Sequence, residues 1–213
     1  SDITDSERSD YDTYKSTYAE RQTVIYVGAR DGMLHAFYAG EFRHGDNKQD
    51  EDPSDPCSAS VPTGIEEHRG YFKWDTEYGP CAPNYGTGEE RWAFIPSNIL
   101  PKLKNNYKGA GDMGYVDASP AAADVKINGE WRTVLVCAQG NGGDTVFALD
   151  VTNGYDPDSV KFLWEFSDPL LYRSKSSPSI GRIRVNGQDI FAAFFTSGTN
   201  RDPNSHGSVF VVD

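Results

Sequence analysis

The stretch TVLVCAQGNGGDTVFALD (residues 133–150) consists of two apolar runs joined by a glycine-rich turn. Two such runs around a short turn predict a β-hairpin. The same construction occurs at residues 24–38, which read VIYVGARDGMLHAFY, and at residues 190–213, where a longer turn separates the runs. Three similar hairpins in one chain indicate a repeated structural unit.

Smaller landmarks fix the length of that unit. The dipeptide Ser-Pro at 119–120 recurs at 177–178, and Asn-Gly at 128–129 recurs at 186–187, each after 58 residues. The first two hairpins lie farther apart, because residues 41–90 are polar, rich in proline and glycine, and without a strand pattern. Treated as an insertion, this segment leaves a repeat of about 60 residues.

Each unit contains four strand-like segments. After the first Ser-Pro they are, in order, residues 121–127, 131–138, 145–151 and 162–167. Residues 92–97, WAFIPS, correspond to the last of these in the preceding unit. Four antiparallel strands in a repeated unit predict the blade of a β-propeller. A β-sandwich is the alternative, although sandwiches need not repeat their turns in sequence.

At this repeat length the 213 residues hold about three blades, the last one incomplete. Propellers close with about four to eight blades, and an open array leaves an apolar flank exposed. The sequence therefore predicts an all-β, β-propeller-like array of four-stranded antiparallel blades, incomplete in this chain. Residues 1–213 would be part of one domain that needs the remainder of its own propeller, with residues 1–20 as a lead-in segment and residues 41–90 as an insertion loop within the first blade.

The charge and the apolar runs exclude two classes of partner. The chain has 20 basic and 32 acidic residues, which give a net charge of −12. Such an acidic surface repels phosphate backbones, so we expect no nucleic-acid partner. The longest apolar runs have about five residues, far fewer than the ~20 that a membrane helix needs. We therefore expect no membrane span in this segment.

The first hairpin carries a more specific signal. Residues 21–37, RQTVIYVGARDGMLHAF, resemble the signature of the C-terminal propeller of PilY1-type proteins, the type IV pilus biogenesis and tip-adhesin family. The similarity continues at residues 90–100, 115–120 and 148–152. Family members usually carry asparagine where this chain has Arg30, and that position precedes the signature residues Asp31, Gly32, Met33, Leu34 and His35.

The resemblance implies a non-catalytic, pilus-associated surface protein that supports pilus assembly and adhesion. It implies an extracellular location at the pilus tip or in the outer cell envelope, reached through the periplasm. The implied partners are pilus subunits or minor pilins and a surface or host ligand. The calcium loop of the family usually follows the segments seen here, so we expect no cofactor in this segment and leave calcium open for the full-length protein.

Two further features fit this family without requiring a binding role. Tyr11, Tyr14 and Tyr18 are spaced by three and four residues, which fits the short helical lead-in of the family and predicts packing on the core. His35 alternates with apolar neighbours on a predicted strand. This pattern favours a hydrogen-bonded structural role for the histidine over a metal-binding one.

A quinoprotein-type dehydrogenase is the alternative function. Residues 148–154, ALDVTNG, followed by Trp164, resemble the repeat that docks adjacent blades in those enzymes, which is a structural similarity. Their redox centre typically needs a vicinal cysteine pair, whereas Cys57, Cys81 and Cys137 are far apart in this sequence. The sequence has no Gly-x-Ser-x-Gly elbow and no paired histidine spacing, so we predict no catalytic residue. A generic extracellular propeller scaffold is a third interpretation.

The first half of the insertion is acidic and includes Asp46, Asp50, Asp52 and Asp55. Oxygen ligands at short spacing can hold Ca²⁺, but the Asp-x-Asp-x-Asp-Gly pattern is absent. A solvated acidic loop is the default interpretation, and these aspartates remain candidate metal ligands.

Cysteines and aromatic residues mark the rest of the insertion. Cys57 and Cys81 have 23 residues between them. A disulfide between them would stabilise the loop by ~3 kcal/mol in an oxidising compartment, whereas Cys137 lies in a strand and is expected to be a buried free thiol. The aromatic residues form either a small core or an exposed contact surface. They are Tyr71, Phe72, Trp74, Tyr78 and Tyr85.

Overall fold

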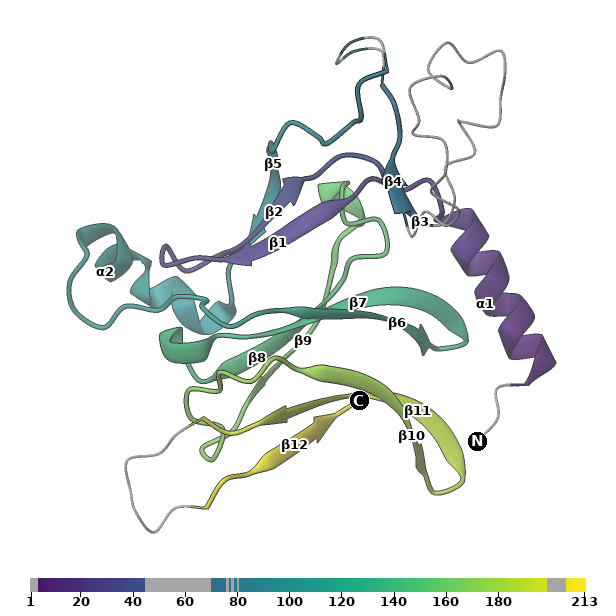
Figure 1. Ribbon diagram of the computed structural model, residues 1–213. Helices are drawn as coiled ribbons and strands as arrows, with labels where there is room; N and C mark the ends of the chain where they lie inside the picture. The colour runs from purple at the N-terminus through teal and green to yellow at the C-terminus, as the bar shows by residue number, and fades with distance from the viewer. Residues whose placement is uncertain (1–3, 45–69, 76, 78, 80, 199–205) are drawn as a thin grey trace, which may run out of the picture.

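The computed structural model describes residues 4–44, 70–75, 77, 79, 81–198 and 206–213. These residues form three antiparallel sheets and a two-stranded ribbon. Figure 1 shows the sheets stacked one above another, with the four-stranded sheet, called sheet 2, between sheet 1 near the N-terminal strands and sheet 3 near the C-terminus. The all-β propeller architecture expected from the repeat is confirmed, and the described residues form no closed ring.

Sheet 2 is the complete unit. It contains β6 (Ala121–Ile127), β7 (Glu130–Ala138), β8 (Thr145–Asp150) and β9 (Lys161–Ser167), paired antiparallel in sequence order. A short 3₁₀ turn, Gly140–Gly142, lies in the connection between β7 and β8 and leaves their pairing intact. The prediction of one four-stranded blade across residues 115–168 is thus confirmed.

The sheets on either side contain three strands each among the described residues. Sheet 1 consists of β1 (Val24–Gly28), β2 (Leu34–Tyr38) and β5 (Glu90–Phe94). Sheet 3 consists of β10 (Ser179–Val185), β11 (Gln188–Thr196) and β12 (Val209–Val212). The three hairpins found in the sequence are β1–β2, β7–β8 and β11–β12, so they occupy corresponding places in successive sheets.

The repeated Asn-Gly dipeptides form the same turn in sheets 2 and 3. Asn128 and Gly129 have φ angles of 52° and 85°, and Asn186 and Gly187 have 51° and 82°. Positive φ at both central residues is the mark of the type I′ turn, whose twist matches that of the two flanking strands. The 58-residue step in the sequence is therefore a step from one blade to the next.

The core consists of the two seams between sheets. On one face of sheet 2, Leu135 and Phe147 pack with Leu34 of sheet 1. On the other face, Val136 and Ala148 pack with side chains of sheet 3. Every residue of β8 is consequently buried, as expected for a strand covered on both faces.

The outer faces of sheets 1 and 3 remain apolar. Ile25 and Val27 of sheet 1 are 53% and 45% exposed, and Val209 and Val211 of sheet 3 are 72% and 51% exposed. Alternating residues of one strand lie on one face, so each pair belongs to the outer side of its sheet. This is the exposed apolar flank expected from an open array of blades.

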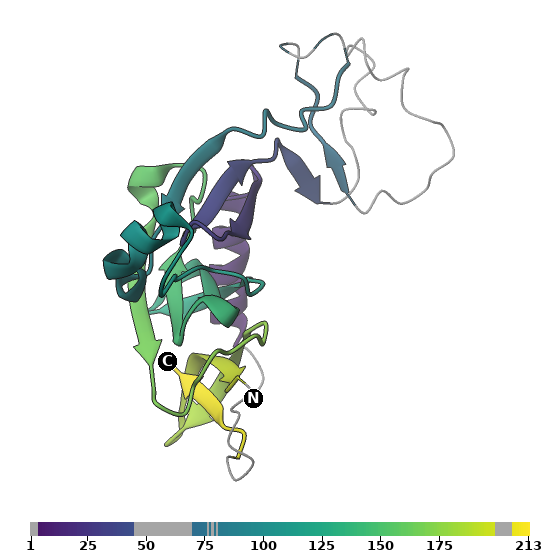
Figure 2. The same ribbon diagram turned by 90° about the vertical axis from the view of Figure 1, so that its left-hand side faces the viewer.

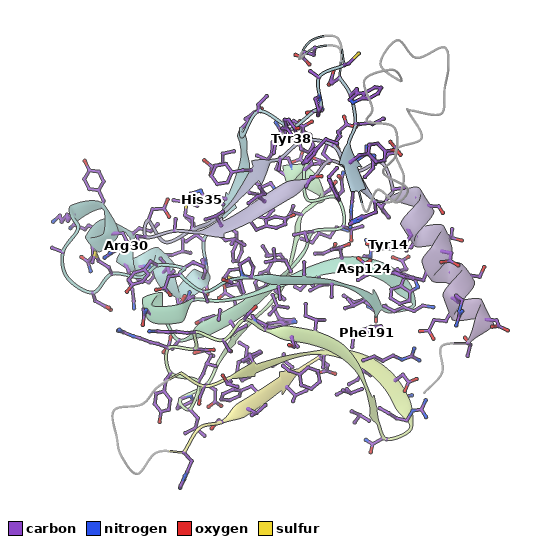
Figure 3. The ribbon with its side chains drawn as sticks, in the orientation of Figure 1. Tyr14, Arg30, His35, Tyr38, Asp124 and Phe191 are labelled. Carbon is purple, nitrogen blue, oxygen red and sulfur yellow. The ribbon has the colours of Figure 1, made fainter. Side chains whose placement is uncertain are left out.

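The lead-in segment contains α1 (Asp5–Thr17), which begins at the N-cap Thr4. Tyr14 is buried, its hydroxyl lies 2.6 Å from Thr133 Oγ1, and the Tyr11 hydroxyl donates to Asp124 Oδ2 at 2.9 Å. Figure 3 shows Tyr14 and Asp124 facing each other between the helix and sheet 2. The tyrosines thus pack against the fold as expected, although the helix docks on sheet 2 rather than on the sheet that follows it in sequence.

The predicted insertion leaves sheet 1 between β2 and β5. Its described part contains a ribbon of β3 (Phe42–His44) and β4 (Gly70–Phe72), and Trp74 bridges to Pro83. Figure 2 shows the ribbon projecting from the stack of sheets. The 3₁₀ helix Ser97–Lys102 and then α2 (Leu103–Lys108) follow β5 in the sequence. A further 3₁₀ turn, Pro157–Ser159, lies between β8 and β9. No helix within the described ranges has the length and apolarity to span a membrane.

Candidate functional site

The signature hairpin has a turn that only glycine fits. Asp31 Oδ1 accepts a hydrogen bond from Met33 N at 3.0 Å, and Gly32 has a φ of 105°. A Cβ on Gly32 would lie 2.8 Å from Ile99 Cγ2. Leu34, the next signature residue inward, is fully buried in the seam with sheet 2. Three of the five signature residues, Asp31, Gly32 and Leu34, therefore have a structural explanation in the turn and the core.

The connection between sheets 1 and 2 covers this turn. Asn106 Nδ2 donates to Asp31 O at 2.9 Å, and Asn106 Oδ1 accepts from Gly114 N at 3.0 Å. The guanidinium of Arg30 lies 5.5 Å from the centre of the Tyr115 ring, within the range of a cation–π contact. Arg30, where family members usually carry asparagine, thus contacts the same connection; it is labelled in Figure 3.

His35, the last signature residue, lies between two carboxylates. Its Nδ1 is 2.7 Å from Glu90 Oε1, and its Nε2 is 3.0 Å from Asp31 Oδ2. The side chain is 14% exposed. Burial alone would lower the pKa of His35, but the hydrogen bonds to Glu90 and Asp31 and their charges raise it above the ordinary 6.5. His35 thus has the hydrogen-bonded role expected for it, whereas its partner Glu90 could not be identified from the sequence pattern.

The seam between sheets 1 and 2 shows how the Asp-Thr-Gly turn docks blades. Thr152 Oγ1 donates to Asp150 Oδ1 at 2.6 Å within the turn, and Trp92 Nε1 donates to Gly154 O at 2.7 Å across the seam. A Cβ on Gly154 would lie 2.0 Å from Tyr26 Oη. Trp164, the counterpart of Trp92, instead lines a groove of about 610 Å³ between sheets 2 and 3.

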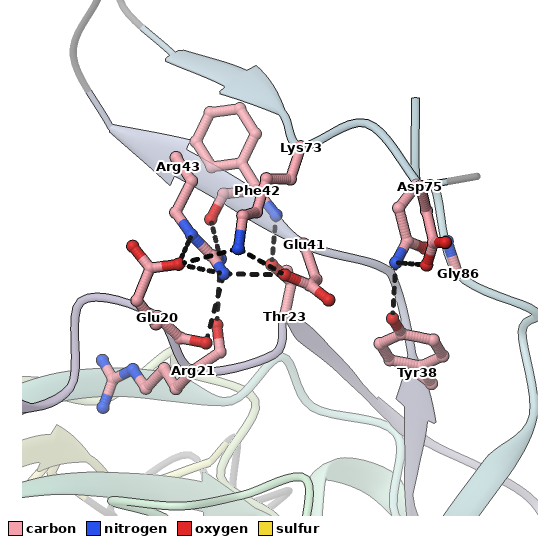
Figure 4. A network of polar contacts seen from close by, with 11 residues as sticks. Glu20, Arg21, Thr23, Tyr38, Glu41, Phe42, Arg43, Lys73, Asp75 and Gly86 are labelled. Carbon is pink, nitrogen blue, oxygen red and sulfur yellow. Dashed lines mark hydrogen bonds and ion pairs between the residues drawn. The ribbon is translucent and has the colours of Figure 1, made fainter. Parts of the chain in front are cut away.

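The base of the insertion is held by Arg43, which is only 6% exposed. Its guanidinium donates to Glu20 Oε2 at 3.1 Å, to Glu41 Oε2 at 2.9 Å and to Arg21 O at 3.3 Å (Figure 4). Lys73 Nζ lies 3.2 Å from the same Glu20 oxygen. Hydrogen bonds from Lys73 and Arg43 outweigh partial burial and lower the pKa of Glu20 below 4.5. We call these residues the Arg43 network.

A second buried polar side chain, Asn84, anchors the segment that leads from the insertion back to β5. Asn84 is 2% exposed, and its Nδ2 donates to Tyr38 Oη at 3.0 Å and to Asp75 Oδ2 at 3.3 Å. Asn84 Oδ1 accepts from Gly86 N at 2.9 Å. The outgoing end of the insertion is therefore tied to the segment before β1 and the returning end to β2, and backbone hydrogen bonds join the two ends. Arg43 and Asn84 had no signal in the sequence, because neither belongs to a repeat.

Aromatic rings form a row along the ribbon. The Phe42 and Phe72 ring centres are 5.3 Å apart, and those of Phe72 and Tyr85 are 4.8 Å apart. Tyr71, Phe72 and Trp74 are half-buried, whereas Tyr85 is 64% exposed. Of the predicted contact residues, Tyr78 lies outside the described residues. The inner rings therefore pack together as a small core while Tyr85 faces solvent, and a contact role for this row stays a prediction.

The remaining candidates lie partly outside the described residues. Cys81 takes part in a disulfide, but Cys57 is outside those residues, so the Cys57–Cys81 pair stays a prediction that peptide mapping of the non-reduced protein checks. Cys137 is a buried free thiol, as expected, and burial raises its pKa to about 12. The candidate metal ligands Asp46, Asp50, Asp52 and Asp55 also lie outside the described residues. The described part of the chain contains no group of three metal-ligating side chains.

Comparison with known proteins gives consistent matches. The profile of the PilY1 beta-propeller domain matches residues 87–199. The type IV pilus biogenesis factor PilY1 of Pseudomonas aeruginosa (strain UCBPP-PA14) is 30% identical over 211 residues, which cover 96% of this chain and 14% of that protein. A PilY1 homolog of Xylella fastidiosa (strain Temecula1) is 33% identical over 164 residues, which cover 74% of this chain and 9% of the homolog.

A solved structure shows the same fold. The crystal structure of the Pseudomonas aeruginosa PilY1 C-terminal domain aligns with a TM-score of 0.57 and 28% identity, covering 95% of this chain and 30% of that one. The chain thus spans 14% of the length of a curated relative and 30% of the solved domain. The chain belongs to the PilY1 family, and its stacked sheets match the β-propeller domain of that family.

Proposed function

We propose that this chain works as part of the propeller of a type IV pilus biogenesis factor, and that it acts by binding rather than by catalysis. The observation that carries the proposal is the 30% identity to the Pseudomonas aeruginosa PilY1 across 96% of the chain. The proposed location is extracellular, at the pilus tip or in the outer cell envelope, after export through the periplasm. The proposed partners are pilus subunits or minor pilins and a surface or host ligand.

Within this function we assign adhesion to the ribbon. It projects from the stack (Figure 2), the Arg43 network holds its base, and its aromatic row ends in the exposed Tyr85. Rigid aromatic side chains supply much of the binding energy at protein interfaces. A surface of this kind suits capture of a partner, and the stack of sheets would act as its support.

The dehydrogenase alternative loses its main support. The ALDVTNG turn packs against the adjacent blade through the hydrogen bond from Trp92 to Gly154 O, and not through Trp164, which follows the turn in the sequence. The similarity to quinoprotein enzymes is therefore accounted for by blade packing. We propose no catalytic residue and no cofactor for this segment, and calcium binding by the full-length protein stays a prediction.

The test is complementation of a strain that lacks the full-length gene. We expect the deletion to reduce surface pili, measured as sheared pilin, and to reduce attachment to a surface. The full-length gene carrying Tyr85→Ala should restore pili but not full attachment. Tyr107→Ala is the matched control, because Tyr107 is 94% exposed on α2, and it should restore both.

Two results would contradict the proposal separately. Wild-type levels of pili and attachment in the deletion strain would refute the pilus function. Full attachment by the Tyr85→Ala strain would remove the ribbon from the proposal and leave the pilus function standing.

A further inference from the structure

We propose that Asp31, His35 and Glu90 form a proton-dependent clamp, which holds β5 against the signature hairpin and releases it as the pH rises. One imidazole lies between two carboxylates, with a ring nitrogen facing each of them. The distances are 2.7 Å from Nδ1 to Glu90 Oε1 and 3.0 Å from Nε2 to Asp31 Oδ2. The inference concerns how sheet 1 is held together and does not rest on the proposed pilus function.

The chemistry of the imidazole ring makes this arrangement sensitive to a proton. Ionised carboxylates only accept hydrogen bonds, and a neutral imidazole carries a single N–H group. Both contacts can therefore be hydrogen bonds only when His35 is an imidazolium. Loss of the proton leaves a ring lone pair facing a carboxylate oxygen. Asp31 and Glu90 are 48% and 46% exposed, so either carboxylate can turn toward water once its hydrogen bond is lost.

Among the described residues, the ion-pair partners of His35 are both acidic. Its neighbours across the sheet are Val27 on β1 and Ala93 on β5, and the Phe37 ring lies 6.0 Å from its own. The charged groups that face it are the two carboxylates, from the β1–β2 turn and from β5. The protonation of His35 is therefore governed by its partners in the clamp.

The position of Glu90 determines what the clamp controls. Glu90 is the first residue of β5, the strand by which the chain returns from the insertion. The β2–β5 pairing shifts register between Ala36 and Phe37, and Phe37 is the residue opposite Glu90. The ladder is thus irregular at this end, and the contact with His35 supplements it. Opening of the clamp would free the start of β5 while its inner part stays paired.

The direction of the pH dependence follows from linkage. The pKa of His35 in the folded protein is raised above the ordinary 6.5. The stabilisation is therefore complete below about pH 6.5 and is lost as the pH rises through the raised value. The clamp is therefore closed below that range and opens once the pH exceeds the raised pKa of His35.

The experiment is an NMR titration of the histidines combined with hydrogen exchange of β5 between about pH 5.5 and 8.5. We expect His35 to titrate above 6.5, and Glu90→Gln to lower its midpoint by about one pH unit because a nearby negative charge is removed. Exchange of β5 amides, corrected for intrinsic rates and compared with β6, should accelerate across the His35 midpoint. In the Glu90→Gln protein that acceleration should disappear.

The control is His44→Asn, which replaces an exposed histidine at the end of β3; it should leave both the His35 midpoint and β5 exchange unchanged. A His35 midpoint at or below 6.5 in the unsubstituted protein would overturn the inference. Exchange of β5 that does not change with pH, or that changes equally in Glu90→Gln, would also overturn it.

Discussion

Sheet 2 and the insertion ribbon are held in place by different forces. Sheet 2 is covered on both faces, and all residues of β8 are buried among apolar side chains. The ribbon projects from the stack, and its base is fastened by the buried polar side chains Arg43 and Asn84. Hydrophobic burial is non-directional and nearly insensitive to pH, whereas charge-assisted hydrogen bonds depend on both partners being present. The two regions should therefore respond differently to the same perturbation.

The largest expected effect is in the stack. Phe147 is fully buried in the seam with sheet 1, 5.0 Å from the Phe94 ring. Phe147→Ala should lower the free energy of unfolding by about 3–5 kcal/mol, because it leaves a cavity in a close-packed core. Denaturant unfolding followed by tryptophan fluorescence measures this loss. The matched control is Phe162→Ala, at a position 57% exposed, which should cost about 1 kcal/mol or less. Similar losses in both variants would contradict a core centred on sheet 2.

A smaller effect, confined to the ribbon, is expected from Arg43→Met. The change removes the donor that joins Glu20, Glu41 and the Arg21 carbonyl. It should lower the free energy of local opening of β3 and β4 by about 1–3 kcal/mol, with little effect on global unfolding. Hydrogen exchange of the ribbon amides provides the measurement.

Lys73→Met is the control for this prediction. Lys73 contacts the same Glu20 carboxylate, but its side chain is 43% exposed. An exposed ion pair contributes about 0–1 kcal/mol, so ribbon exchange should change little. If Lys73→Met loosened the ribbon as much as Arg43→Met, burial of Arg43 would not be the reason for its effect.

The sequence predicted the part of the molecule that repeats. The Asn-Gly turns and the strand order of sheet 2 follow from similar residues at similar spacing. The tryptophan that docks on the turn after Asp150 is Trp92, whereas the sequence pattern pointed to Trp164. The Arg43 network, Asn84 and Glu90 occur once, and their partners lie many residues away or in the unpatterned insertion. Spacing alone cannot identify such contacts, because they depend on where the insertion leaves and rejoins sheet 1.

The position of α1 was missed for a related reason. The tyrosine spacing predicted a helix with a packed face, and Tyr14 is buried as expected. Its partners, Asp124 and Thr133, belong to sheet 2, more than a hundred residues later. A periodic pattern shows which face of a helix is covered, but not which sheet covers it.

A modest loss of stability is expected at the seam of sheets 1 and 2, where a hydrogen bond lies among packed apolar side chains. Trp92→Phe keeps an aromatic ring but removes the donor to Gly154 O, and it should cost about 1 kcal/mol of unfolding free energy. Trp131→Phe is the matched control, because the buried Trp131 Nε1 has no hydrogen-bond partner among the described residues. An equal loss in the two variants would show that ring volume, not the hydrogen bond, determines the effect at Trp92.

The smallest effect is a response of the ribbon to acid. The pKa of Glu20 is lowered in the folded protein, so its contribution is present above about pH 4.5 and is lost as the pH falls through the lowered value. Ribbon exchange, corrected for intrinsic rates, should therefore accelerate in acid, and Glu20→Gln should abolish that acceleration. The direction of this pH dependence is opposite to that of the His35 clamp, which opens as the pH rises. If exchange of the ribbon and exchange of β5 both accelerated toward the same end of the pH range, the assignment of Glu20 and His35 as the titrating groups would be contradicted.

Native-state hydrogen exchange of β8 compared with β3 and β4 tests most directly whether the ribbon is an appendage held independently of the blade stack. We predict that β8 amides exchange only through global unfolding, whereas ribbon amides exchange through a local opening of much lower free energy. Arg43→Met should reduce only the opening free energy of the ribbon, and Phe147→Ala chiefly the free energy of global unfolding reported by β8. Equal free energies for the two segments, falling together in both variants, would show a single cooperative unit and contradict this account.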